Sequence, residues 1–241
     1  MKIRRSLNEN ISNVRSRVWM ALSLCMLNLS ATYTAFVLVP GAVEYSKLHM
    51  DRRMLLMLAM ELEAALVVSM CFALIKYFTE KESSLNSRVD TSDILKKMIV
   101  TTLALLLLLV LFSLMCGFMS GIIYSMLSGR LSYETIKLIV DILTGILTVI
   151  LIPAVILETV SVLKSKKLIK AAAEDGLVNV RTGYLSMLRF EIVLFAVIIL
   201  IAVLFHFVIS SKGNMLTIII YTIAGSIITY FSYIKAAELC K

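Results

Sequence analysis

The chain has 241 residues, of which 60% are apolar and only 17% charged, and its formal net charge is +8. Soluble domains carry about 45–50% apolar and about 25% charged residues, so this composition excludes an ordinary soluble domain. The apolar residues stand in long continuous blocks, whereas a membrane β-barrel requires short alternating segments. The predicted fold class is therefore an all-α integral membrane protein.

Six apolar blocks are long enough to cross a bilayer, which takes roughly 20 residues of helix. We predict a single transmembrane domain over residues 1–241, built as a polytopic helical bundle. The expected spans cover residues 18–42, 54–77, 98–127, 137–163, 190–210 and 214–235. The first block is too long for the apolar core of a signal peptide and lacks a small-residue cleavage site, so we expect it to be a membrane span.

Residues 1–17 precede the first span and have an amphipathic pattern. Apolar side chains recur every three or four residues at Ile3, Leu7, Ile11 and Val14, which places them on one helical stripe. Such a basic helix can lie in the membrane interface, with its cations near anionic head groups. The alternative is an ordinary basic flank that only sets the topology.

The basic residues outside the spans predict the orientation. With the N-terminus inside, the cytoplasmic segments hold eighteen Lys and Arg residues and the outer segments hold six. Cytoplasmic loops of membrane proteins are enriched in these residues, so we predict cytoplasmic N- and C-termini in a plasma membrane. Because these residues flank spans instead of forming one patch interleaved with aromatics, no nucleic-acid partner is expected.

Two long cytoplasmic segments, residues 76–97 and 164–191, are predicted to form helical elbows. In the first segment, Asp90 and the polar residues after it are expected to cap a helix that starts near Ile94.

In the second segment, the fourth membrane helix is expected to continue past Lys164 until Asp175-Gly176 ends it, with a new helix starting near Thr182. Charged residues of both elbows are the predicted partner-docking residues. They are Asp93, Lys96, Lys97, Lys166, Lys167, Lys170 and Arg181.

Acidic residues inside spans are candidates for function, because burying a charge in lipid is costly. Glu61 and Glu63 lie within the second span, and two residues on a helix are about 200° apart, so they cannot form one coupled pair. Asp141 and Glu158 lie near the two ends of the fourth span. For them, snorkelling or a salt bridge to the following lysines is the favoured alternative.

Small residues on the third span predict close helix packing. Ser113, Gly117, Gly121 and Ser125 recur every four residues along one edge, and such an edge lets another helix approach closely. In the fourth span, Pro153 predicts a kink.

The sequence contains no motif for nucleotide hydrolysis, zinc proteolysis or a nucleophile elbow, so no enzyme activity and no cofactor are expected. The four cysteines and two histidines are not at metal-ligand spacing, so no metal site is expected.

An interfacial N-terminal helix, six spans and helical elbows together resemble, in outline, the separate permease subunits of ATP-driven exporters. The resemblance implies a dimer that moves an apolar or amphipathic substrate and receives force from an ATPase subunit through the elbows. The loop between the fourth and fifth spans is longer than in many such permeases. Two alternatives remain open: a non-transporting membrane interaction protein, such as an immunity, assembly or signalling subunit, and an ion-coupled carrier that uses intramembrane carboxylates. A homo- or hetero-oligomer in the lipid bilayer is expected for the chain.

Overall fold

The computed structural model describes residues 2–35, 49–83, 90–165, 167, 169–206 and 215–240. These residues form six helices and no strand, which confirms the predicted all-α fold. The helices are α1 (Lys2–Tyr33), α3 (Met50–Ser83), α4 (Thr91–Leu127), α5 (Tyr133–Lys164), α6 (Ile169–His206) and α7 (Met215–Leu239).

Four of these helices, α3, α4, α5 and α7, are long and apolar enough to cross a membrane. The predicted spans 18–42 and 190–210 both run into residues outside the described part of the chain. The longest apolar helix, α4, has 37 residues and is therefore about 55 Å long, well beyond the roughly 30 Å hydrocarbon core. The helix is therefore longer than a single membrane crossing requires.

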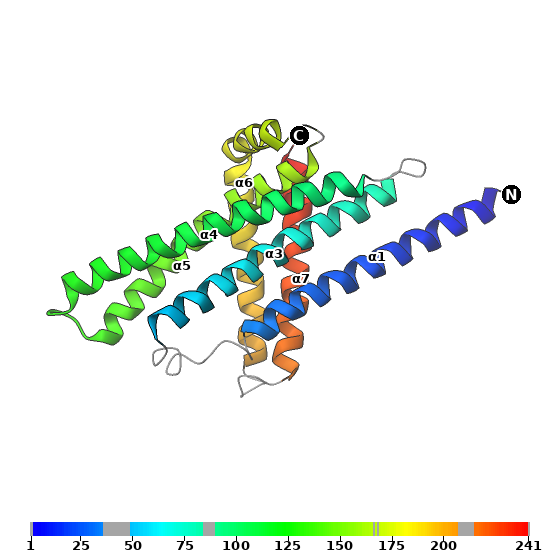
Figure 1. Ribbon diagram of the computed structural model, residues 1–241. Helices are drawn as coiled ribbons and strands as arrows, with labels where there is room; N and C mark the ends of the chain where they lie inside the picture. The colour runs from blue at the N-terminus through cyan, green and yellow to red at the C-terminus, as the bar shows by residue number, and fades with distance from the viewer. Residues whose placement is uncertain are drawn as a thin grey trace.

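The helices form two groups that cross each other (Figure 1). Helices α3, α4 and α5 run alongside one another, and α6 descends beside α7 across them. Helix α1 packs on α3 and α7, and its N-terminal end projects away from the other helices.

Packing is concentrated at one end of the molecule, which we call the packed end. There the last turns of α3, α5 and α7 meet the first turns of α4, around a core that includes Phe72, Leu157, Leu163, Tyr233 and Ala236.

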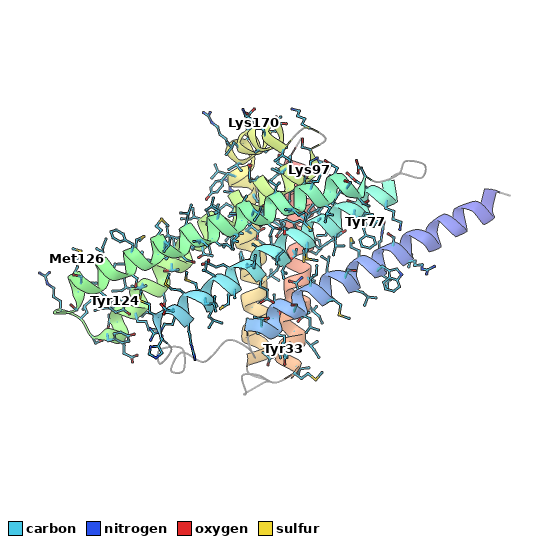
Figure 2. All side chains as sticks on the ribbon, viewed as in Figure 1. Tyr33, Tyr77, Lys97, Tyr124, Met126 and Lys170 are labelled. Atoms are coloured by element: carbon cyan, nitrogen blue, oxygen red, sulfur yellow. The ribbon has the colours of Figure 1, made fainter. Side chains whose placement is uncertain are left out.

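At the opposite, splayed end the helices separate. None of residues 106–127 of α4 is buried, and Figure 2 shows Tyr124 and Met126 at the far tip of the α4–α5 hairpin. The rings of Tyr124 and Tyr133 stack with their centroids 5.6 Å apart and close this tip. Large apolar side chains along α4 and α5 are therefore exposed on the surface of the chain.

The N-terminal segment differs from the prediction of a separate interfacial helix. Residues 2–17 are helical, but they form the first half of the continuous helix α1. No helix breaker separates this segment from the first span, since the first proline of the chain is Pro40 and no glycine precedes it. An uninterrupted run of backbone hydrogen bonds is therefore favoured over a turn.

The first elbow agrees with its predicted cap. Asp90 precedes α4, and its carboxylate accepts hydrogen bonds from the backbone amides of Ser92 (3.1 Å) and Asp93 (3.2 Å). The helix begins at Thr91, three residues before the predicted start, because the cap is Asp90 itself.

The second elbow has a different construction from the predicted one. Helix α5 ends at Lys164, and α6 runs without a break through Asp175-Gly176, where the sequence predicted a helix end. A glycine inside a helix costs only about 1 kcal/mol, so it does not enforce a stop. Figure 1 shows that the first part of α6 lies across the packed end before the helix turns down beside α7. The elbow is thus formed by the early part of α6.

Candidate functional site

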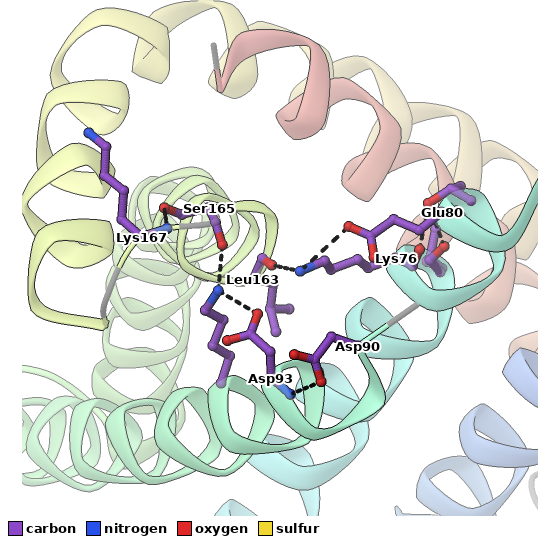
Figure 3. Close-up of polar contacts among 10 residues, drawn as sticks. Lys76, Glu80, Asp90, Asp93, Leu163, Ser165 and Lys167 are labelled. Atoms are coloured by element: carbon purple, nitrogen blue, oxygen red, sulfur yellow. Dashed lines mark hydrogen bonds and ion pairs between the residues drawn. The ribbon is translucent and has the colours of Figure 1, made fainter. Parts of the chain in front are cut away.

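Two buried lysines hold the C-terminal end of α5 (Figure 3). Lys97 of α4 is 1% exposed, and its Nζ donates to the carbonyl of Ser165 and to the carboxylate of Asp93, at 2.7 Å. Lys76 of α3 donates to the carbonyl of Leu163 and forms an ion pair with Glu80 at 3.7 Å.

A third lysine holds the end of α7 in the same manner. The Nζ of Lys164 donates to the carbonyls of Ala237 (2.6 Å) and Cys240 (2.8 Å). The last four carbonyls of a helix lack partners in their own helix and form the negative end of its dipole. A cation at this position satisfies them, so Lys76, Lys97 and Lys164, which we call the lysine caps, connect α3, α4, α5 and α7 into one unit.

The predicted docking residues divide into two groups. Lys97 is buried in its cap and does not face a partner in this structure, while Asp93 pairs with it. Lys96, Lys167, Lys170 and Arg181 are exposed, and Figure 2 shows Lys170 at the outer side of the packed end. Lys167 forms an ion pair with Asp175 at 2.7 Å. Lys166 lies outside the described residues.

An exposed stripe follows the early part of α6. Lys170, Glu174, Val178, Arg181 and Leu185 are spaced by three or four residues, which places them on one face of the helix. All five are exposed, including the apolar Val178 (61%) and Leu185 (65%). We call this the α6 stripe. It lies outside the predicted spans, where an exposed apolar side chain is not explained by contact with lipid tails.

The two acidic residues of the second span lie in different surroundings. Glu63 accepts hydrogen bonds from the hydroxyls of Thr34 (2.9 Å) and Ser30 (3.3 Å), so it connects α3 to α1. Glu61 is 8% exposed, and neither of its carboxylate oxygens has a hydrogen-bond partner among the described residues. Buried carboxylates usually have partners, so Glu61 is the more unusual of the two.

The two acidic residues of the fourth span also differ. Asp141 is exposed. Glu158 makes no ion pair with the lysines that follow it within the described residues, and its Oε2 atom is buried without a partner. Its carboxylate lies against the backbone of Gly176 in α6, where a Cβ atom would be 2.2 Å from Oε2. The glycine therefore permits a close contact between α5 and α6 instead of ending a helix.

Glu191 was not among the predicted functional residues; it lies where the predicted second elbow (164–191) and the predicted span 190–210 overlap. The structure places it inside α6 at 1% exposure, where one oxygen accepts from Ser232 of α7 at 2.7 Å and the other has no partner among the described residues. A signal was present in the sequence. Gly176, Gly183, Met187 and Glu191 recur at helical spacing, and all four are buried on one face of α6.

The small-residue edge of α4 faces away from the rest of the chain. Nothing lies within 4 Å of a Cβ atom placed on Gly117 or Gly121, Ser125 is exposed, and Ser113 is half-buried. No described helix of this chain therefore uses Gly117 or Gly121 for close packing. By contrast, Gly225 of α7 contacts Asn28 of α1, at 2.9 Å between a placed Cβ and the side-chain oxygen.

Pro153 lies inside α5, which continues through it. A proline cannot donate to the carbonyl one turn earlier, and its ring disturbs that turn. The neighbouring carbonyl of Ile150 accepts a hydrogen bond from the hydroxyl of Tyr184 in α6, at 2.9 Å. Helix α6 thus supports α5 next to its proline.

No protein-family model, curated protein or solved structure matches this chain. Among the residues that the structure describes, no group of three or more His, Cys, Asp or Glu side chains is placed to hold a metal ion. The candidate functional features of the described residues are the packed end, the α6 stripe and the carboxylates of the predicted spans.

Proposed function

We propose that this chain is a permease subunit that moves an apolar or amphipathic substrate, works as a dimer, and is driven by a separate ATPase subunit. In this proposal the packed end faces the cytoplasm of a plasma membrane, and the ATPase docks on the α6 stripe.

The observation that carries the proposal is the α6 stripe together with the contacts that join α6 to the other helices. Val178 and Leu185 are exposed next to charged neighbours, a mixture typical of the surfaces at which proteins meet. The same part of α6 packs on α5, and Asn179 donates to the hydroxyl of Ser161 at 2.9 Å. Because the lysine caps join α5 to α3, α4 and α7, a force applied to the stripe would reach all of these helices.

The proposal is tested by purifying the chain in mild detergent from its native host and identifying the proteins that accompany it by mass spectrometry. We expect a stoichiometric ATPase that is lost in the double variant Val178→Ser, Leu185→Ser. Leu131→Ser is the matched control, because Leu131 is an exposed leucine in the turn between α4 and α5. Recovery of the chain alone, or with a membrane partner that is no ATPase, would contradict the proposal and favour a membrane interaction protein.

One observation favours a second candidate, an ion-coupled carrier. Glu61 is a buried carboxylate in a predicted span with both oxygens unpartnered among the described residues, a state suited to binding and releasing a proton or a cation. For such a carrier, Glu61→Gln would abolish pH-dependent uptake into vesicles. A Glu61→Gln protein that keeps its transport activity and its pH dependence would exclude this candidate.

A further inference from the structure

An apolar cavity lies between α4, α5 and α6 near the packed end. Its volume is about 300 Å³, and it is lined by side chains from residues 100–108 of α4, 151–162 of α5 and 169–180 of α6. This size is at the lower end of the range for pockets that bind small molecules. The cavity is therefore suited to one compact apolar group.

Among the described residues, one ionisable group lines the cavity. Leu105, Val155 and Ala173 are typical of the lining, and Glu158 is the only acidic or basic residue that the described part of the chain contributes to it. The Oε2 atom of Glu158 is buried and has no hydrogen-bond partner among the described residues. Oε2 is held against Gly176, but Glu158 as a whole is only half-buried and lines the cavity. A cationic donor in the cavity would therefore stabilise its carboxylate.

Gly176 fixes the place of this carboxylate. A Cβ atom at residue 176 would be 2.2 Å from Oε2, 2.6 Å from the carboxyl carbon and 2.8 Å from Oε1 of Glu158. Any larger residue would displace the group. The glycine thus gives the carboxylate its position at the boundary between α5 and α6, beside the cavity.

The chemistry of the cavity selects among ligands. An anion would be repelled by the carboxylate, and a purely apolar molecule would leave the charge of the carboxylate without a partner. A molecule with an apolar body and a basic amine fills the cavity and makes a charge-assisted hydrogen bond, which is about twice as strong as a neutral one. A two-chain lipid needs more apolar volume than the cavity offers.

We propose that the cavity at Glu158 binds compact amphipathic amines, with the ammonium group on the Glu158 carboxylate and the apolar body between α4, α5 and α6. The binding site itself does not depend on the proposed transport function. Only the further step, that the bound amine is the transported substrate, rests on that function.

The test uses the full chain purified in detergent, without any ATPase. The probe is a short-chain alkylamine that carries a photoactivatable diazirine at its tail, and the matched probe is the corresponding alcohol. After illumination, the labelled peptides are mapped by mass spectrometry. We expect the amine to label the cavity stretches of α4, α5 and α6 at lower concentration than the alcohol.

Three variants make the result specific. Glu158→Gln should raise the half-saturating amine concentration about tenfold, while binding of the alcohol changes little. Gly176→Ala should weaken amine binding as well, because it displaces the flexible carboxylate while favouring the helix. Glu134→Gln is the control, since Glu134 is an exposed acid in the first turn of α5.

Equal labelling by amine and alcohol, labelling away from the cavity, or an unchanged response in Glu158→Gln would overturn the binding site. These outcomes are separate from those of the co-purification experiment. An ATPase that co-purifies with a chain lacking amine preference would leave the transport proposal intact and remove only the ligand class.

Discussion

At the scale of single residues, the lysine caps predict that replacing Lys97 lowers the stability of the fold much more than replacing its neighbour Lys96. Lys97→Met removes the donor from the Ser165 carbonyl and from Asp93, so the variant should lose about 1–3 kcal/mol of stability. Lys96→Met is the control, because Lys96 is exposed. Thermal unfolding of both variants in the same detergent measures the difference, and equal midpoints would show that the cap contributes nothing.

Cys240 gives a prediction about pH. Burial raises the pKa of the Cys240 thiol above its ordinary value, and the nearby ammonium of Lys164 offsets this only in part. The thiolate is the form that reacts with maleimide, so the raised pKa shifts labelling to higher pH. The test uses chains in which the other native cysteines are replaced by alanine. The rate of maleimide labelling of Cys240 should be low and should still rise with pH in the range where the labelling rate of an exposed cysteine, Lys170→Cys, no longer changes. Matching pH profiles for the two cysteines would contradict the burial of this thiol.

Single residues also show which features could be predicted from the sequence and which could not. Asp90 was correctly identified as a helix cap, because a cap depends on two or three adjacent residues. Lys97 was predicted to dock a partner and Glu191 was given no role, yet both are buried by helices that are distant in the sequence. Their burial depends on where α5 ends and how α7 packs, which no local pattern determines.

At the scale of the helices, a buried polar pair joins α6 to α7. Ser232→Ala leaves Glu191 without its only observed donor, and a buried carboxylate without a partner costs about 1–3 kcal/mol or more. Ser226→Ala is the matched control, since that buried hydroxyl bonds only to the Thr222 carbonyl of its own helix. The expected result is a lower unfolding midpoint for Ser232→Ala alone; a larger loss for Ser226→Ala would argue against the pair.

Some helix boundaries are determined by the local sequence and others by contacts with distant helices. The apolar blocks of α3, α4, α5 and α7 were predicted, because a membrane helix requires a long apolar run. The predicted helix end at Asp175-Gly176 was wrong. A glycine that ends a helix and a glycine inside a helix that leaves room for a side chain of a neighbouring helix can have the same local sequence. Only the position of Glu158 on α5 distinguishes the two.

At the scale of the whole molecule, the open edge of α4 tests the proposed dimer. Nothing in the described part of the chain lies within 4 Å of a Cβ atom placed on Gly121, so Gly121→Leu should leave the fold of the single chain unchanged. A second copy packed on this edge would be displaced by the larger side chain, which lowers the dimer fraction measured by light scattering after size exclusion. Gly129→Leu, which also points into open space, is the control. A dimer that withstands Gly121→Leu does not use this edge.

The proposed function requires that the packed end, with the α6 stripe, faces the cytoplasm. Single cysteines at Val178→Cys and Leu131→Cys, in a chain without native cysteines, can be labelled in intact cells with a maleimide that does not cross membranes. We predict that Leu131→Cys reacts from outside, while Val178→Cys reacts only after the cells are opened. Labelling of Val178→Cys in intact cells would place the α6 stripe outside, where no cytoplasmic ATPase could dock, and would contradict the proposed function.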